Sequence, residues 1–317
     1  MLTNPRCYGV ARVFTAAPLV RHTQGMPELP EVEALAAFLR ERASGHAVAH
    51  AYVAAISVLK TYDPPPESLT GLVIGEVSRH GKFLDLPAAP AGGGDVVHLV
   101  VHLARAGWLR WREDIPPQPP KPGKGPLAFR VILDDGSGFD LTEAGTQKRL
   151  AVYVVRDPMD VPGVASLGPD PLDPAFTAQS LGDLLAGRRM QIKGVLRDQR
   201  IIAGIGNAYS DEVLHAAKMS PFKMASTLTP EQVSGLYEAI VTTLHDASKR
   251  AAGLAAGDLK AEKKTGLRVH GKTGEACPVC GDTIREVSFA DSSLQYCATC
   301  QTGGKPLADR RLSRLLK

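Results

Sequence analysis

Aromatic residues and long apolar runs are both scarce in this sequence. Aromatic residues make up 5% of the 317 residues, against 44% hydrophobic and 22% charged residues, which is an ordinary balance for a globular protein. No apolar run approaches the roughly 20 residues that a membrane-spanning helix needs. We therefore expect a soluble protein without a membrane partner. A chain of this length also has room for two domains with separate cores.

Cysteine is scarcer still, with five residues, and its placement excludes a disulfide scaffold. Cys7 stands alone, and the other four cysteines form two close pairs near the C-terminus. Such pairs are a poor framework for disulfides and a good framework for a metal ion. Free cysteines of this kind indicate a reducing compartment, so we expect a cytoplasmic protein.

A strong excess of charge is also absent, because the net charge is only +4. The charges are nevertheless uneven, since residues 260–317 contain 11 Lys and Arg against 6 Asp and Glu. A basic C-terminal end suits a polyanionic partner such as nucleic acid. A plain solvated surface explains the same charges, so composition alone leaves the partner open.

The first half of the chain contains three stretches of different texture. Residues 1–25 show neither a helical period nor strand alternation, and they lack the uninterrupted apolar core of a signal peptide. Apolar positions from Val32 to Leu39, after Pro30, predict a helix. From residue 46 to about residue 155, short apolar runs split by Gly and Pro predict a β-sandwich or barrel.

The second half is helical in pattern. The Pro-rich stretch 158–174 lacks a period and is interpreted as a linker, and a helical period follows it as far as residue 253. Residues 257–274 are polar and basic, and we expect them to form a mobile loop. The predicted fold class is α+β with several domains: an extension at 1–25, a β-sandwich domain at 26–157, the linker at 158–174, a helical domain at 175–268, a cysteine segment at 269–304 and a basic tail at 305–317.

The cysteine pairs predict a structural zinc site. Cys277 and Cys280 are followed, after sixteen residues, by Cys297 and Cys300. Each C-x-x-C turn can direct two thiolates at one ion, and two turns complete the tetrahedron that structural zinc prefers. Four protein ligands leave no place for a reactive water, so the ion should fold the segment rather than catalyse. A redox-active dithiol is the alternative, but the thioredoxin-like context that it needs is missing.

A glycine-containing turn, Gly204-Ile205-Gly206-Asn207, joins two helical stretches. Two glycines allow a tight turn and a close approach to a ligand, and Asn207 is well placed to cap the following helix. A helix start with free N–H groups also binds phosphate. A plain packing corner between two helices explains the same pattern, so this turn alone does not decide a function.

Four separated motifs together resemble the Fpg/Nei family of DNA glycosylases. They are Met26–Glu33, Leu167–Leu172, Ile192–Leu214 and the four-cysteine segment. The resemblance extends to about Gly304 and implies an N-terminal β-sandwich, a helix–two-turn–helix domain and a zinc finger. It also implies a base-excision repair enzyme that removes oxidised bases from double-stranded DNA and has abasic-site lyase activity. Such an enzyme would act as a monomer at the bacterial nucleoid.

The resemblance also implies the catalytic residues. Pro27 matches the family's N-terminal proline nucleophile, and Glu28 matches its general acid, with Glu31 as an assisting carboxylate. An α-amino group titrates near ~8, against ~10.4 for lysine, so more of it is neutral and able to form a Schiff base at pH 7. Without the other motifs, the same residues would be an ordinary lead-in to a helix.

Three further residues match DNA-contacting positions of the family. Lys82 matches a lysine of the catalytic site that contacts the DNA backbone near the lesion. Lys193 and Asn207 map onto phosphate-binding positions, where contacts position an enzyme without reading sequence. A lone lysine is usually just solvated, so both lysines depend on the resemblance.

Several positions depart from the family's pattern. In the full chain the nitrogen of Pro27 is locked in an amide, so catalysis requires that the working chain starts at Met26 and then loses this methionine. Ser292 stands where the family has an arginine five residues before the third cysteine, and Arg105 stands where it often has a methionine. The usual Arg-Phe-Gly stretch is missing from residues 143–148, so the residues that fill the space of the flipped base are not assigned.

These departures leave a second hypothesis open, namely a non-catalytic, zinc-containing protein that binds damaged DNA without cutting it. Ser292 and the extension at 1–25 favour this alternative. A ribosomal or tRNA-linked helix–turn–helix protein explains neither the proline–glutamate start nor the finger. The Pro-Glu-Leu-Pro-Glu motif favours oxidised purines as the substrate of an enzyme, without deciding between purines and pyrimidines.

Overall fold

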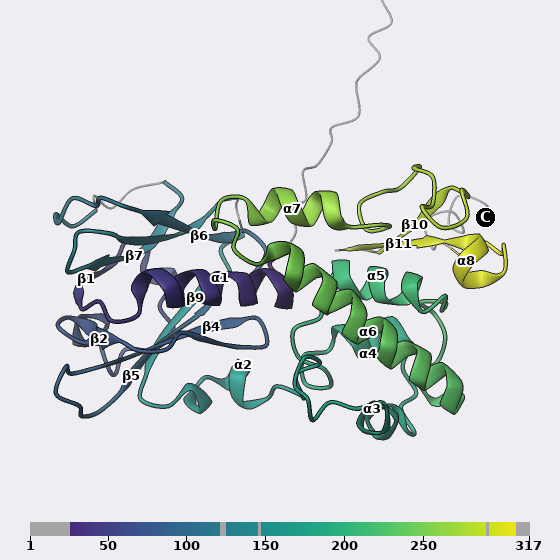
Figure 1. Cartoon of the computed structure of the whole chain (residues 1–317), viewed down its shortest axis with the longest axis horizontal. Coiled ribbons are helices and arrows are strands. Elements are labelled where there is room, and N and C mark those ends of the chain that lie inside the picture. The colour runs from purple at the N-terminus through teal and green to yellow at the C-terminus, as the bar shows by residue number, and fades with distance from the viewer. Residues whose placement is uncertain (1–25, 121–124, 145–146, 290–291, 309–317) are drawn as a thin grey trace, which may run out of the picture.

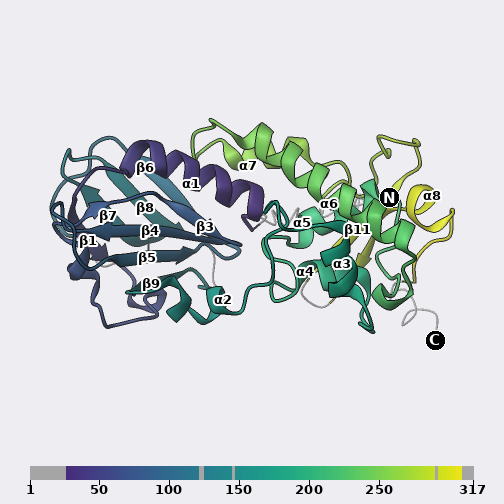
Figure 2. The same cartoon turned by 60° about the horizontal axis from the view of Figure 1, so that its bottom comes forward.

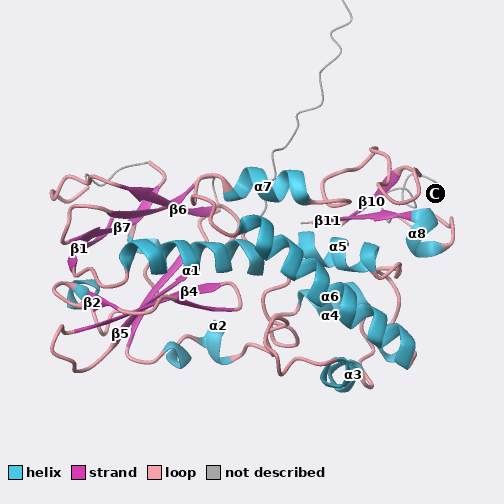
Figure 3. Ribbon diagram, viewed as in Figure 1, coloured by secondary structure: helices cyan, strands magenta, loops and turns pink. Residues whose placement is uncertain are grey.

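The computed structural model describes residues 26–120, 125–144, 147–289 and 292–308, so the extension at 1–25 and most of the tail at 305–317 lie outside the described residues. The chain forms two lobes that lie side by side, with strands gathered in one and helices in the other (Figure 1, Figure 3). Among the described helices, none combines the length and the apolar character that crossing a membrane requires.

The N-terminal lobe is the predicted β-sandwich, built from two antiparallel sheets. One sheet has the strand order β1-β7-β8-β6, and the other has the order β2-β4-β5-β9, with β3 paired to β4. The first sheet consists of β1 (Val48–Val53), β7 (Leu127–Leu133), β8 (Gly138–Glu143) and β6 (Gly107–Arg112). The second consists of β2 (Val73–Ile74), β3 (Ser78–His80), β4 (Phe83–Ala89), β5 (Val97–His102) and β9 (Ala151–Val155).

The helix α1 (Leu29–Ala43) belongs to both lobes. Its apolar side, which includes Leu35, packs with Leu84 and Phe129 of the two sheets in the core of the sandwich. Its first residue, Leu29, is instead part of the core of the helical lobe. The start of α1 therefore lies at the junction of the lobes (Figure 2).

The second lobe is helical, as the sequence pattern predicted. Thr177 and Thr229 each form a reciprocal capping box that fixes the start of a helix. The apolar faces meet in a core around Ile205, Tyr209 and Leu236. The helices are α3 (Ala178–Leu185), α4 (Ile192–Arg197), α5 (Asn207–Ala216) and α6 (Pro230–Ala251).

The segment predicted as a linker is held on the sandwich. It contains the short helix α2 (Pro162–Ala165), and Val161 and Val164 pack against Val100 of β5 and Val155 of β9. Further along this segment, Asp170 accepts a hydrogen bond of 2.6 Å from the Nη1 atom of Arg79. The two lobes are thus joined by a packed segment as well as by α1.

The prediction of a mobile loop at 257–274 is wrong, because this segment contains the helix α7 (Leu259–Gly266). α7 lies beside α1 and α6 (Figure 1, Figure 2). Leu259 is buried in the core of the sandwich, and the side chain of Lys263 is buried by ion pairs. Apolar periodicity predicts helices from buried apolar residues, so it assigned this polar, lysine-rich stretch to a loop. It does not detect a helix that is held by a buried ion pair of a lysine.

The C-terminal segment forms a small hairpin followed by one helical turn. Strands β10 (Ile284–Ser288) and β11 (Ser293–Cys297) pair in an antiparallel ladder, and α8 (Ala298–Thr302) follows. This segment packs beside α5 of the helical lobe. It carries the four cysteines predicted to bind zinc.

Candidate active site

The carboxylate of Glu28, which directly precedes α1, caps the N-terminus of α5. Its Oε1 atom accepts a hydrogen bond of 2.9 Å from the backbone N–H of Ala208, and its Oε2 atom accepts from those of Gly206 and Tyr209. The partial positive charge of a helix start favours an anion there. A Cβ atom on Gly206 would lie 2.4 Å from Cδ of Glu28, so only glycine leaves room for this approach.

Glu28 is 2% exposed, and its charge is set by opposing effects. Burial raises the pKa of the carboxyl, but Lys263, Lys82 and the N–H of Ala208 together outweigh burial and lower the pKa below its usual value. Glu28 is therefore a carboxylate in the resting protein. It can donate a proton only after accepting one.

The predicted capping role of Asn207 is wrong, because Glu28 occupies the capping position. Gly206 is the N-cap residue, and Asn207 is the first residue of α5, with no side-chain capping bond. The Nδ2 atom of Asn207 instead donates to the carbonyl oxygen of Ser293 in the finger, at 2.8 Å. Its Oδ1 atom is buried without a hydrogen-bond partner among the described residues. Asn207 therefore ties the start of α5 to the finger.

Glu31 lies at the centre of a second group of contacts. Its Oε2 atom accepts from the backbone N–H of Glu28 at 2.8 Å and from Nζ of Lys263 at 2.7 Å. Its Oε1 atom accepts from the hydroxyl of Tyr209 at 2.7 Å. The side chain is 1% exposed, and both of its oxygen atoms accept hydrogen bonds, so it orients Lys263, Tyr209 and the backbone of Glu28.

Pro27 is buried directly beside these carboxylates. The carbonyl oxygen of Met26, whose carbon is bonded to the nitrogen of Pro27, accepts a hydrogen bond of 3.1 Å from Nζ of Lys263. The structure thus brings the predicted nucleophile, the predicted acid Glu28 and the assisting Glu31 into one cluster at the junction of the lobes.

Lys82 joins the same cluster from the β3–β4 turn. It is 6% exposed, and its Nζ atom donates to the carbonyl oxygen of Ile205 at 2.9 Å. Burial lowers the pKa of Lys82 to about 8, although the charge of Glu28 acts in the opposite direction. The amine therefore points into the cluster and titrates close to neutral pH.

Lys193 is placed differently from the other site residues. It is 5% exposed, and its Nζ atom donates to Asp211 at 2.6 Å, to Ser210 at 2.7 Å and to the carbonyl oxygen of Asn207 at 3.2 Å. Burial lowers the pKa of Lys193, although Asp211 acts to raise it. All these partners belong to α5, so in this structure the side chain of Lys193 packs against the start of that helix and stabilises it.

The positions that depart from the family's pattern lie in two turns. Arg105 is exposed in the turn between β5 and β6, directly after Ala104, whose φ is 53°. Ser292 lies at the end of the finger hairpin, where its carbonyl oxygen accepts from the N–H of Phe289 at 2.8 Å. Residues 145 and 146, within the stretch that lacks Arg-Phe-Gly, lie outside the described residues.

Sequence reasoning missed three residues of this site. Lys263 lay in the presumed loop, and Tyr209 resembled an ordinary core residue. Glu212 accepts from three successive backbone N–H groups, those of Arg268, Val269 and His270, and so fixes the chain that leads into the finger. No local pattern marks such partners, because each is defined by a contact across the fold.

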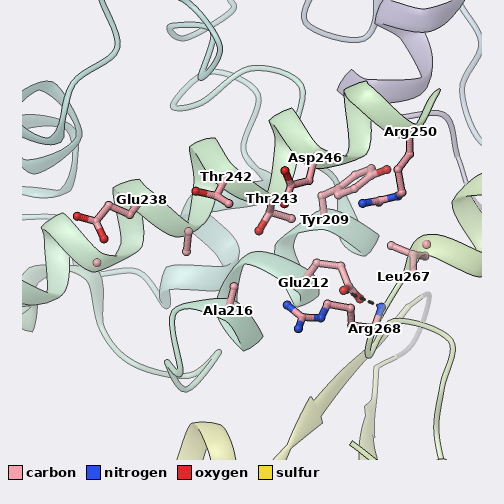
Figure 4. A pocket seen from close by; sticks show the side chains of 13 residues that line it. Tyr209, Glu212, Ala216, Glu238, Thr242, Thr243, Asp246, Arg250, Leu267 and Arg268 are labelled. Carbon is pink, nitrogen blue, oxygen red and sulfur yellow. Dashed lines mark hydrogen bonds between the residues drawn. The ribbon is translucent and has the colours of Figure 1, made fainter. Parts of the chain in front are cut away.

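A cavity of about 310 Å³ lies behind the cluster, between α5, α6 and residues 266–268. Figure 4 shows Glu212 of α5 and Thr243 and Asp246 of α6 on its walls, with Arg250 and Arg268 at its border. Tyr209 is shared between this cavity and the cluster. Its walls carry both signs of charge, so the cavity itself does not indicate a ligand.

The four cysteines form the predicted metal site. The Sγ atoms of Cys277, Cys280, Cys297 and Cys300 all lie within 4.8 Å of one another. A tetrahedral zinc ion with Zn–S bonds of about 2.3 Å requires sulfur atoms of this spacing. The Nε2 atom of His215 of α5 lies 3.3 Å from the sulfur of Cys277, so the site is braced against the helical lobe. The finger therefore holds one structural zinc ion.

Comparisons with known proteins agree with this architecture. The family models for the formamidopyrimidine-DNA glycosylase N-terminal domain, for its H2TH domain and for the zinc finger found in FPG and IleRS match residues 26–148, 167–256 and 274–303. A formamidopyrimidine-DNA glycosylase of Symbiobacterium thermophilum is 34% identical over 300 residues, which is 90% of this chain and 93% of that protein. An uncharacterized formamidopyrimidine-DNA glycosylase-like protein of Mycobacterium tuberculosis is 60% identical over 156 residues, 49% of this chain and 98% of that protein.

Solved structures show the same fold. The Lactococcus lactis formamidopyrimidine-DNA glycosylase bound to DNA containing an AP site is 27% identical, with a TM-score of 0.73 over 87% of this chain and 99% of that chain. The MutM protein of Thermus thermophilus is 29% identical, with a TM-score of 0.72 over 88% of this chain and 100% of that chain. The chain therefore belongs to the formamidopyrimidine-DNA glycosylase family, and it is a DNA glycosylase with abasic-site lyase activity in base excision repair.

Proposed function

We propose that this chain, shortened to begin at Pro27, excises oxidised purines from double-stranded DNA through a Schiff base on the nitrogen of Pro27. The observation that carries the proposal is the cluster in which Pro27, Glu28, Glu31 and Lys82 meet at the start of α5. A secondary amine beside a buried carboxylate is suited to attack a sugar carbon and to manage the protons of that step.

The chemistry follows from the charge of Glu28. Its carboxylate can accept the proton of the Pro27 ammonium, which frees the amine, and can then deliver that proton to the ring oxygen of the sugar. The amine attacks C1′, the bond from C1′ to the base breaks, and the base leaves with the bonding electron pair and the proton of the attacking nitrogen. The bond from C1′ to the ring oxygen then breaks as this oxygen takes the proton from Glu28, so the sugar ring opens and C1′ and the nitrogen form an iminium. The iminium that results acidifies the C2′ proton, so loss of this proton expels the 3′ phosphate and cuts the strand.

Relatives support the choice of substrate. A MutM structure with 27% identity holds DNA containing carbocyclic 8-oxo-G, and the Lactococcus lactis enzyme has been solved with DNA containing an AP site and with DNA containing an oxidised pyrimidine. Extrusion of the target base costs a few kcal/mol, and less for a damaged pair. We propose the same class of substrate for this chain. In this proposal Lys82 and Asn207 lie near the DNA strand, and Lys193 stabilises α5.

We further propose that it acts as a monomer on chromosomal DNA in the cytoplasm.

Borohydride trapping on an oligonucleotide with an abasic site tests this proposal. The chain that starts at Met26 should lose this methionine and form a covalent adduct, and mass spectrometry should place the adduct on the peptide that begins with Pro27. The matched control is the full 317-residue chain, in which the Pro27 amide cannot react. An adduct of equal yield in both proteins would contradict the assignment of the nucleophile.

A non-catalytic protein that recognises damage is the second candidate. Ser292 favours it, because the finger lacks the arginine that the resemblance leads one to expect there. The same experiment separates the two candidates. A Met26-start protein that binds abasic DNA tightly but gives no adduct would support the non-catalytic one. Glu28→Gln should also slow base excision by about 10²–10⁴-fold, as is usual for loss of a general acid.

A further inference from the structure

Lys263 is a lysine of the site that the resemblance does not supply. It lies on α7, is 7% exposed, and directs its ammonium into the catalytic cluster. Nζ lies 2.7 Å from Glu31, 3.1 Å from the carbonyl oxygen of Met26 and 3.8 Å from Oε1 of Glu28. It also lies 4.8 Å from the centre of the Tyr209 ring.

The contact with Met26 locates the ammonium relative to the reaction. The carbonyl carbon of Met26 is bonded to the nitrogen of Pro27, as the sugar C1′ is bonded to it in a Schiff base. The carbonyl oxygen is therefore only two bonds from that nitrogen. In the chain that begins at Pro27 this carbonyl is absent, and the ammonium of Lys263 faces the amine directly.

We propose that Lys263 is a positioning residue that keeps the amine of Pro27 unprotonated at neutral pH and holds Glu31 in place. This inference rests on the proposed function, in which Pro27 is the nucleophile. A neighbouring cation disfavours the ammonium form of an amine, and it thereby increases the fraction that can attack. Glu28 and Glu31 act in the opposite direction, because each carboxylate stabilises the ammonium form.

The balance of charge around Pro27 explains why a second lysine is needed. Several charged or titratable groups face the cluster. They are Glu28 just before α1, Glu31 of α1, Lys82 of the β3–β4 turn, Arg197 of α4, Tyr209 of α5, Glu262 and Lys263 of α7, and His270. Lys82, whose pKa of about 8 leaves it mostly charged at neutral pH, supplies one positive charge against the two carboxylates. Without Lys263 the amine of Pro27 would face a net negative charge and would hold its proton more tightly.

The pH dependence of trapping tests this inference. In the Met26-start protein, the rate of borohydride trapping on abasic DNA is measured from about pH 5.5 to about pH 9.5, a range that spans the ordinary pKa of an α-amino group. Lys263→Met should move the midpoint of the trapping-rate profile to higher pH. At pH 6, trapping should be about tenfold slower for each pH unit by which the midpoint moves, and near pH 9 the rate should equal that of the parent protein. Lys263→Arg should keep the midpoint of the parent. Lys264→Met, on the exposed side of the same helix, is the matched control.

Two results would overturn the inference. One is an unchanged midpoint in Lys263→Met, and the other is an equal loss of trapping at every pH, which would show a merely structural role. If Lys263→Met does not fold because Glu31 loses its partner, the double variant Glu31→Gln/Lys263→Met removes both charges and should restore a midpoint close to the parent's. A displaced midpoint in that variant would also contradict the inference. Absence of any adduct in the parent protein would instead refute the proposed function.

Discussion

The carboxylate of Glu28 accepts a hydrogen bond of 2.9 Å from the backbone N–H of Ala208, which lies 180 residues further along the chain. This contact joins the first residues of the sandwich lobe to the first turn of α5. It fixes the proposed acid at the helix start, where the amide groups favour its charged form.

Gly206→Ala should damage the site without replacing any group that reacts. The added Cβ would lie 2.4 Å from Cδ of Glu28, so the carboxylate must leave its three amide donors. We expect a loss of about 1–3 kcal/mol in the free energy of unfolding, as for other overpacked sites, together with a large loss of base excision. Chemical denaturation and single-turnover excision would measure both effects.

Gly235→Ala is the control for that variant. Gly235 lies on an exposed part of α6, and a Cβ there would meet nothing within 4 Å. Alanine should stabilise the helix by up to about 1 kcal/mol. Similar losses of excision in the two alanine variants would show that the close approach of Glu28 to Gly206 is unimportant.

Lys82→Met should raise stability at neutral pH while it removes function. The folded chain lowers the pKa of Lys82 from 10.5 to about 8, so the unfolded chain binds more protons between these values and stability rises with pH across that window. Below pH 8 the folded chain carries the full cost of burying a cation. The variant removes this cost, on the order of 1–3 kcal/mol.

The advantage of Lys82→Met should therefore be largest below pH 8 and disappear towards pH 10.5. Thermal unfolding at about pH 7 and at about pH 10, on either side of the lowered pKa, would measure it. The carbonyl of Ile205 keeps a second donor, Nε2 of Gln199 at 2.6 Å, so the variant leaves no unpaired acceptor. A melting temperature that falls equally at both pH values would contradict the prediction.

Removal of zinc should unfold the finger and leave the two lobes intact. The four thiolates hold together a segment whose own apolar core is very small. After chelation we expect loss of DNA binding, with the strand and helix signals of the lobes retained in circular dichroism. Loss of the whole fold on chelation would show that the finger supports the helical lobe more strongly than its contacts suggest.

Ser292→Arg should strengthen DNA binding. The position lies at the end of the finger hairpin, and an arginine there could reach a phosphate. One added phosphate contact steepens the plot of log K against log salt by about 0.9. Titrations of abasic duplex at several salt concentrations would show this slope. Ser292→Gln has similar reach without the charge and should leave the slope unchanged.

The sequence predicted those parts of the site whose residues are adjacent in the chain or follow a regular spacing. Pro27 and Glu28 adjoin each other, and the cysteines follow a spacing that has one common chemical use. Asn207 was assigned the cap of α5 because a helix start is normally capped locally. The residue that takes this place, Glu28, lies 180 residues before Ala208 in the chain, and no local pattern records it.

Lys263 was missed for a related physical reason. A stretch with four charged side chains between Leu259 and Gly266 shows no apolar period strong enough to indicate a packed helix. The helix is held by Leu259 at one end and by the pairing of Lys263 with Glu31. Buried ion pairs of this kind depend on the final arrangement of the lobes, so a linear pattern does not reveal them.

The amide groups that hold Glu28 lie in the helical lobe, and Leu29, the residue after Glu28, packs in the core of that same lobe, so the carboxylate and its donors form one unit. Lys82 lies in the β3–β4 turn of the sandwich, and its charge lowers the pKa of Glu28, so a displacement of one lobe relative to the other would change that pKa through their separation. Proton affinity at the reaction centre then varies with the gap between the lobes.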